Sequence, residues 1–412
     1  MERYAIVAGV IAFAASLTGH DAEAGVAVEK GYVGAEIYHY PQDGAAVQEH
    51  GNAAIVSQVE LRARISDRWA AKLTPFARYD ALDSHRNTFD LREAEIEYSN
   101  GAWRASAGLR SISWSVTESV GVLPHQVVDV VNQRDLAGDP SGRERMGAAM
   151  VTASYRFEST VIEASVLPWF RERKFADRRA REHPYRAAID LADPMVEYSS
   201  DAGAGYVGGA LRVARSFDAA DVAFIQYRGY LPQPLIAPHA PTGQAAALYY
   251  LIDMSALTVQ ATSGQWLIKS ETAYFGTRQN GPRFPGVPSD YWGSVSGVEY
   301  TFVNLFAGTD LGVFVEGMYD SRGAAPNGTP FHKNAFFGIR WVANDQADSQ
   351  LLCGVMSSLD ERAQVAQLEY QRRIGTSLQF ELILRTFDAA ETSPLSAFND
   401  DSVGFFRLRG FF

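Results

Sequence analysis

A β-hairpin is encoded by Leu91-Arg92-Glu93-Ala94-Glu95-Ile96-Glu97-Tyr98, the turn Ser99-Asn100-Gly101-Ala102 and Trp103-Arg104-Ala105-Ser106-Ala107-Gly108-Leu109-Arg110. An Asn-Gly pair between two runs of alternating polarity is the strongest short-range hairpin signal. Because side chains alternate along a strand with a period of two, each predicted strand has one mainly apolar face and one charged or small face. A soluble protein would cover the apolar face, but the alternation continues along nearly the whole chain with no helical domain to provide the cover. The pattern therefore predicts an all-β fold, a transmembrane antiparallel β-barrel.

Segments of alternating polarity recur to the C-terminus, each about nine to eleven residues long, which is the length that a tilted strand needs to cross a bilayer. We count about 18 of them, with about 16 as the alternative, and both numbers are even, as single-chain bacterial barrels require. Short turns alternate with long loops, which is the rhythm of periplasmic turns and outer loops. A soluble β-propeller would instead show a four-strand repeat and a polar exterior. The expected strands are residues 28–40, 55–65, 69–81, 91–98, 103–110, 147–157, 160–170, 205–216, 221–230, 246–259, 265–275, 291–302, 311–320, 334–342, 350–359, 364–373, 377–387 and 402–412.

The two ends of the chain carry export and sorting patterns. Arg3, the apolar residues 5–17 and the small-residue site Ala22-Glu23-Ala24 predict a secretory signal peptide over residues 1–24, although a buried N-terminal helix would share the apolar run. Residues 25–412 would then form the barrel. The chain ends on Phe412, and a terminal Phe on an amphipathic strand resembles the sorting signal of outer-membrane barrels; an ordinary edge strand is the alternative. We therefore expect export through the periplasm, recognition by the barrel-assembly machinery, and residence in the cell outer membrane among its lipid and lipopolysaccharide.

Composition excludes several other classes of protein. The chain of 412 residues has a formal net charge of −11 and lacks a basic stripe with interleaved aromatics, so nucleic acid is not an expected partner. Cys353 is the only cysteine, which excludes an internal disulfide and cysteine-based metal or haem sites. The 8 histidines are scattered singly and not at zinc-ligand spacing. We expect no cofactor and no metal, with calcium at Asp400-Asp401 as an alternative to a solvated loop.

The inward faces of the predicted strands carry more basic than acidic residues, although the whole chain is acidic. Such a lumen would attract anions, since lumen charges tune the selectivity of these barrels. The alternative is that opposite charges pair across neighbouring strands, above all Glu93, Glu95 and Glu97 with Arg104 and Arg110. The basic residues assigned to the inward face are Arg62, Arg64, Lys72, Arg78, Arg104, Arg110, Arg156, Arg212, Arg228, Lys269, Arg340, Arg373, Arg385, Arg407 and Arg409.

The long connection after the fifth strand is expected to narrow the lumen, because a barrel of about 16 to 18 strands is wide enough for a water-filled channel. Residues 116–146 contain an apolar run, 124–132, which we expect to form a short helix with Val127, Val128 and Val131 on one side. The run is too apolar to remain in solvent, so the segment is predicted to fold into the lumen. The expected pore-lining or constriction residues are Arg62, Arg64, Arg78, Glu93, Glu95, Arg104, Arg110, Trp114, His125, Asp129, Asn132, Arg134 and Asp135.

Several short motifs resemble an uncharacterised family of large Gram-negative outer-membrane barrels, a domain of unknown function. The signature of that family reads L-R-E-A, G-R-Q, W-G and D-V-V-N-P-x-D, and this chain departs from it at Leu109-Arg110-Ser111, Ser115 and Gln133. More loosely, the chain is similar to alginate-exporter and substrate-specific porin barrels. The resemblance implies a passive outer-membrane channel and leaves its substrate open. The motifs that carry it are Leu91-Arg92-Glu93-Ala94, Trp103 with Gly108 and Arg110, Trp114, Asp129-Val130-Val131-Asn132 and Arg134-Asp135-Leu136.

Other functions fit parts of the sequence. A barrel of this size could hold a partner or a polymer in its lumen as a scaffold or exporter, but a scaffold has little need of an infolded segment. Ser115, His125 and Asp129 are the residue types of a hydrolase triad, yet a triad is defined by spatial roles and not by proximity in sequence. The basic loop 171–181 could contact lipopolysaccharide phosphates or simply be solvated. We therefore expect a porin-like channel and not an enzyme, with passive and anion-preferring passage of small solutes.

Overall fold

The structure is a computed structural model of the chain. It describes residues 26–44, 49–117, 127–135, 144–176, 180–181, 193–238, 244–278, 286–323, 329 and 332–412. The predicted signal peptide, residues 1–24, lies outside the described residues and stays a prediction.

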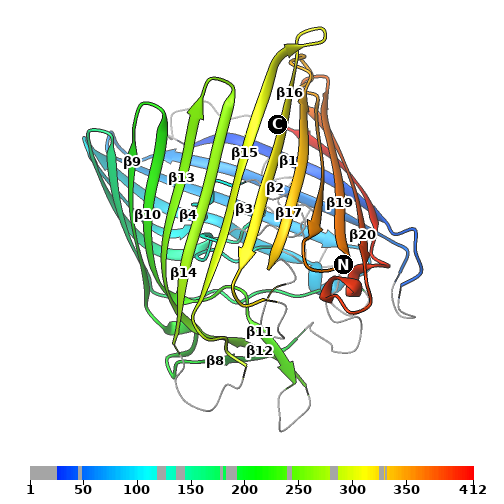
Figure 1. Ribbon diagram of the computed structural model, residues 1–412. Helices are drawn as coiled ribbons and strands as arrows, with labels where there is room; N and C mark the ends of the chain where they lie inside the picture. Colours follow the sequence, from blue (N-terminus) through cyan, green and yellow to red (C-terminus); the bar gives the residue numbers. More distant parts are fainter. Residues whose placement is uncertain are drawn as a thin grey trace, which may run out of the picture.

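One closed antiparallel barrel of 18 strands makes up most of the protein (Figure 1). The last strand pairs with the first, from Tyr32 opposite Phe411 to His39 opposite Gly404, and this pairing closes the sheet. The barrel strands are β1 (Val26–His39), β2 (Gly51–Arg64), β3 (Trp69–Asp80), β4 (Thr88–Asn100), β5 (Trp103–Arg110), β6 (Ala148–Phe157), β7 (Thr160–Leu167), β9 (Gly208–Ser216), β10 (Ala220–Tyr230), β13 (Leu251–Ser263), β14 (Trp266–Arg278), β15 (Tyr291–Leu305), β16 (Thr309–Asp320), β17 (Lys333–Val342), β18 (Gln350–Ser358), β19 (Ala363–Ile374), β20 (Leu378–Ala389) and β21 (Val403–Phe411).

A second sheet of three short strands lies beyond one end of the barrel, at the bottom of Figure 1. Its middle strand β12 (Ala245–Tyr249) pairs antiparallel with β11 (Leu235–Pro238) and parallel with β8 (Met195–Tyr198). In the described part of the chain, the helical elements are the 3-10 turns η2 (Ser84–Arg86), η3 (Gly203–Gly205) and η4 (Pro394–Phe398). Among the described residues, no helix has the length and hydropathy needed to cross a membrane.

Aromatic side chains border the apolar exterior of the wall at both ends. Beside the short turns, the ring pairs Trp69–Tyr98, Trp103–Tyr155 and Trp266–Tyr300 have centroids 4.9, 4.7 and 4.7 Å apart. At the opposite end, Tyr274 and Trp292 pair at 5.0 Å. Aromatic girdles at both interfaces and short periplasmic turns characterise transmembrane barrels, so the long loops and the small sheet mark the outer end.

The sequence-based assignment of the fold is confirmed, with one strand corrected. All 18 expected segments correspond to barrel strands, and the alternative of 16 is wrong. The expected strand 246–259 is two elements, because β12 ends at Tyr249 in the small sheet and β13 begins at Leu251 in the barrel. Every residue from Ala245 to Ile252 is buried, so this stretch shows no alternation that could mark the boundary.

Gly108 permits a close approach between β5 and β4. It has φ of 140°, and a Cβ atom added there would lie 2.1 Å from the carbonyl oxygen of Ala94. Gly410 on β21 is a suitable comparison, since its nearest neighbour would be Leu378 Cδ2 at 3.6 Å.

We expect Gly108→Ala to lower the free energy of unfolding by about 2–3 kcal/mol, because both the positive φ and the clash with backbone oppose a side chain. Gly410→Ala should change it by less than about 1 kcal/mol. Urea titration of the two variants in phospholipid vesicles measures the difference. Equal stabilities would show that β4 and β5 can separate at Gly108 without cost.

Candidate functional site

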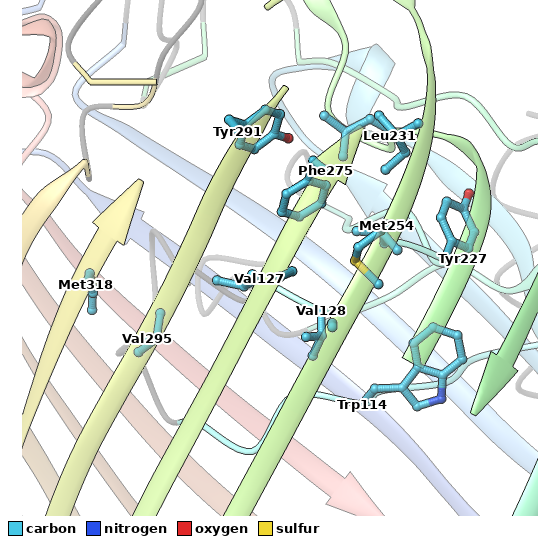
Figure 2. Packing of buried hydrophobic residues seen from close by; sticks show 14 of the residues in the cluster. Trp114, Val127, Val128, Tyr227, Leu231, Met254, Phe275, Tyr291, Val295 and Met318 are labelled. Carbon is cyan, nitrogen blue, oxygen red and sulfur yellow. The ribbon is translucent and has the colours of Figure 1, made fainter. Parts of the chain in front are cut away.

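The described part of the connection after β5 lies inside the barrel, as predicted. In its described part, Val128 is fully buried and Val127, Val130 and Val131 are nearly so. These valines belong to a cluster with inward side chains of the wall, and Figure 2 shows Val127 and Val128 beside the strands that carry Met254, Phe275 and Val295. Residues 127–135 contain bends and one bridge but no helix, so the expected helix is wrong for this part; 118–126 and 136–143 lie outside the described residues. Burial of these apolar side chains against inward residues of the wall holds the segment in the lumen.

Glu271 on β14 binds the segment to that same wall. Its carboxylate accepts hydrogen bonds from the Ser115 hydroxyl at 2.8 Å, the Val127 backbone N–H at 2.9 Å and the Val116 N–H at 3.2 Å. The side chain is fully buried. A buried carboxylate is costly unless hydrogen bonds stabilise it, so Glu271 and the segment depend on each other.

Asp129 and Asn132 organise the segment from within. The Asp129 carboxylate accepts hydrogen bonds from the backbone N–H of Trp114 at 2.6 Å and Ser115 at 3.2 Å, and it pairs with Arg145 at 2.5 Å. The Asn132 amide group donates to the carbonyl oxygens of Arg110 and Met146, both at 2.9 Å, and its oxygen accepts from Ile112 N–H at 2.9 Å. These two side chains therefore replace the backbone pairing that a strand or helix would provide.

A second anchor joins the segment to β4 on another part of the wall. The guanidinium of Arg92 pairs with Asp135 at 2.5 Å, donates to the Arg145 carbonyl at 3.2 Å and lies over the ring of Phe76. Both partners of this ion pair are almost completely buried. Loss of one partner would leave the other charge buried and unpaired, which costs about 3–5 kcal/mol.

Arg92 was not expected to face the lumen, and a β-bulge explains its orientation. The register of β3 and β4 pairs Thr74 with Glu93 and Pro75 with Leu91, so Arg92 is an extra residue without a partner on β3. A bulge shifts the alternation of a strand by one residue. Arg92 and Glu93 consequently both turn inward, which simple alternation does not allow.

Opposite charges pair across the strands at several places in the lumen. Of the pairs that the alternative interpretation named, Glu95 with Arg110 is present, whereas Glu93 and Glu97 pair with residues other than Arg104 and Arg110. Near the periplasmic end, Glu93 pairs with Lys72 at 2.5 Å, Glu97 with Arg62 at 2.5 Å and Glu95 with Arg110 at 3.7 Å. A buried network crosses the seam between β1 and β21, where Glu36 pairs with Arg78 at 2.6 Å and with Arg407 at 2.8 Å. Because Arg78 is buried and paired with Glu36, it is a structural residue of the wall.

Three inward arginines remain outside these pairs: Arg104 on β5, Arg156 on the adjacent strand β6, and Arg212 on β9, which is separated from β6 by β7. None of them forms an ion pair with a residue that the structure describes, and the buried Nε of Arg212 has no hydrogen-bond acceptor there. In the strand register, Arg104 lies opposite Ser154 on β6, and Ser154 lies opposite Glu163 on β7. Glu163 in turn lies opposite Arg212 but forms no ion pair with it. We call these three residues the arginine patch. The patch lies on a different part of the wall from β13, β14 and β15, beside which Val127 and Val128 lie (Figure 2).

The other predicted site residues have mixed positions. Arg64 is exposed beside a periplasmic turn, where it pairs with Asp67 at 2.7 Å. Trp114 is buried in the apolar cluster and does not line a passage. Arg134 lies within the segment, where burial and the neighbouring charge of Arg145 lower its pKa to about 10, so it is cationic at neutral pH. His125 lies outside the described residues.

The structure also places two arginines of the basic outer loop, and it gives the orientation of Arg228. Arg171 pairs with Asp90 at 2.6 Å and Arg181 with Asp401 at 3.1 Å, so these two arginines tie the basic loop to the barrel and are not simply solvated. Among the described residues, no group of acidic or histidine side chains is arranged to hold a metal ion. The inward assignment of Arg228 is wrong: the residue shares its face of β10 with the exposed Phe224.

We expect Glu271→Ala to loosen the infolded segment without disrupting the barrel. The change leaves the buried N–H groups of Val116 and Val127 without an acceptor, so amide hydrogen exchange at residues 127–135 should become at least about tenfold faster. Hydrogen–deuterium exchange with mass spectrometry measures this rate. Glu163→Ala changes an inward carboxylate that forms no ion pair with a described residue, so it should leave the exchange unchanged. Equal rates in both variants would contradict the anchoring role.

Comparisons with known proteins agree with the barrel. No protein-family model and no curated protein sequence matches the chain. Among solved structures, OccK2 (OpdF) of Pseudomonas aeruginosa has a TM-score of 0.53 at 8% identity, over 93% of this chain and 96% of that chain. A BenF-like porin of Pseudomonas fluorescens Pf-5 has a TM-score of 0.53 at 7% identity, over 93% and 97%. OccD3 (OpdP) of Pseudomonas aeruginosa has a TM-score of 0.50 at 10% identity, over 94% and 93%. At these identities the likeness is one of fold, and the chain therefore has the architecture of outer-membrane porin barrels.

Proposed function

We propose that this protein is an outer-membrane diffusion channel for small solutes that prefers anions. The observation that carries the proposal is the arginine patch of Arg104, Arg156 and Arg212, whose guanidinium groups have no ion-pair partner among the described residues. Fixed charges on a lumen wall concentrate solutes of opposite sign and raise their rate of entry.

The position of the infolded segment supports a narrowed passage along the patch. A barrel of this size encloses more space than wall side chains can fill. Figure 2 shows Val127 and Val128 beside β13, β14 and β15, and Glu271 on β14 accepts a hydrogen bond from Val127, whereas the arginines of the patch belong to β5, β6 and β9. Solutes would therefore pass between the segment and the arginines, and not through the centre of a wide tube.

A scaffold that holds a partner in its lumen is the weaker alternative, because part of the lumen is already occupied. The lumen contains a segment of the chain itself, with ion pairs and hydrogen bonds to both β4 and β14. Such a segment would have to leave before a second protein or a polymer could enter. Channel function requires no such displacement, and it requires no catalytic group, so we propose a channel that is not an enzyme.

Recognition by the barrel-assembly machinery through the terminal strand forms part of the same proposal. Phe412 is half exposed and exchanges two backbone hydrogen bonds with Gly31, at 3.1 and 3.0 Å. The C-terminal strand is thus the closing strand of the barrel, and its exposed terminal ring is available before closure.

The arginine patch should determine ion selectivity. We expect Arg104→Gln, Arg156→Gln and Arg212→Gln in combination to lower the chloride-to-potassium permeability ratio at least about threefold, because the patch loses its charge. Reversal potentials in planar bilayers under a potassium chloride gradient measure this ratio. Arg215→Gln, on the exterior face of β9, is the matched control and should keep the wild-type ratio. An unchanged ratio in the triple variant would refute the anion preference.

The infolded segment should set the conductance. We expect deletion of residues 121–135 to enlarge single-channel steps at least about twofold, because it removes the buried valines of residues 127–131, which occupy part of the lumen. Heat-modifiable migration in gel electrophoresis confirms that the shortened barrel is folded before it is measured. If neither the intact nor the shortened protein conducts, the channel proposal fails.

A further inference from the structure

Two arginines and an aspartate form a cluster on the exterior of the barrel near its outer end. Arg228 Nε donates a hydrogen bond to Asp253 Oδ1 at 2.6 Å, and Arg278 Nε donates one to Asp253 Oδ2. The three residues lie on the neighbouring strands β10, β13 and β14, with Arg228 directly opposite Asp253 in the register. We call them the outer arginine cluster.

The cluster faces away from the lumen. Arg228 is four residues from Phe224 on β10, and Asp253 is four residues from Leu257 on β13, so each shares a face with the residue named. Phe224 and Leu257 are opposite each other and are 47% and 49% exposed, as lipid-facing residues are in a barrel considered without its membrane. The arginine side chains are also open, at 55% for Arg228 and 46% for Arg278.

The aromatic girdle gives the depth of the cluster in the membrane. Asp253 pairs with Gly276, which lies two residues beyond Tyr274 towards the outer loops. With a rise of about 3.4 Å per residue, the carboxylate is about 7 Å beyond the girdle tyrosine along the strand. This is the level of the head groups in the outer leaflet, and the exposed Phe224 and Leu257 continue below it towards the hydrocarbon.

Asp253 uses only part of the hydrogen-bonding capacity of the two arginines. Each guanidinium donates through Nε, and neither of its terminal amino groups has an acceptor among the described residues. One carboxylate thus holds two guanidinium groups side by side and leaves the cluster with a net positive charge. Paired terminal amino groups of this kind suit phosphate oxygens, which accept several charge-assisted hydrogen bonds at once.

We propose that the outer arginine cluster binds a phosphate group of lipid A, with the acyl chains lying along the apolar wall around Phe224 and Leu257. The location in the outer leaflet and the apolar surface directly below the arginines favour a phosphorylated amphiphile over free phosphate. Asp253 acts as a positioning residue for both guanidinium groups. The site is independent of the channel, because it lies on the opposite face of the wall from the arginine patch.

Native mass spectrometry of the delipidated protein with added bis-phosphorylated lipid A tests the site. We expect one lipid A to bind to the wild type, and the double variant Arg228→Gln and Arg278→Gln to bind it at least about tenfold more weakly, because charge-assisted hydrogen bonds are lost. Dephosphorylated lipid A should bind the wild type as weakly as the double variant binds the phosphorylated form. Inorganic phosphate in about tenfold excess over the lipid should not displace it.

The control is Arg215→Gln, an exterior arginine near a periplasmic turn whose guanidinium lies over the Phe217 ring. This variant should bind lipid A as the wild type does. Unaltered single-channel conductance of the double variant shows that its barrel is intact and separates this result from the channel proposal. Equal lipid A binding by the wild type and the double variant, or equal binding of the dephosphorylated lipid, would overturn the assignment.

Discussion

The pairing of backbone N–H and carbonyl groups inside a bilayer is the constraint on which this structure depends. The hydrocarbon core offers no hydrogen-bond partner, so strands can cross it only in a sheet without edges. Closure through β1 and β21 meets that requirement. The same pairing buries a charged network at the seam, where Glu36 contacts both Arg78 and Arg407.

Closure with this many strands creates the second problem of the fold, which is an interior too wide for wall side chains to fill. A segment of the chain itself occupies part of this interior. Its valines pack with inward side chains of the wall and enlarge the apolar core. A segment without regular structure leaves backbone N–H groups unpaired. Here the buried carboxylates of Glu271 and Asp129 accept hydrogen bonds from four of these N–H groups. These polar groups in the lumen thus stabilise the infolded segment.

The charged residues of the barrel are of two kinds, those that form ion pairs and those that do not. Paired charges, such as Lys72 with Glu93 and Arg92 with Asp135, hold strands and segment together and contribute little net field. Charges that lack a counter-ion remain available to molecules outside the protein. On the inner wall these are Arg104, Arg156 and Arg212 of the arginine patch, which have no ion-pair partner among the described residues. On the outer wall, Arg228 and Arg278 share the single carboxylate of Asp253, so one of their two positive charges has no counter-ion within that cluster.

Sequence alone was enough to assign the class of fold, because alternation with a period of two is a local property. It failed only where alternation is absent, at the buried stretch that joins β12 to β13. It also identified the connection after β5 as an infolded element, since an apolar run cannot remain in solvent. It could not identify Arg92, because a bulge changed the parity of β4 at that residue. It could not identify Glu271 as an anchor, because that contact joins residues 155 positions apart and exists only once the barrel has closed. Whether a lumen charge is paired or free likewise depends on strand register, and register is decided by the tertiary structure.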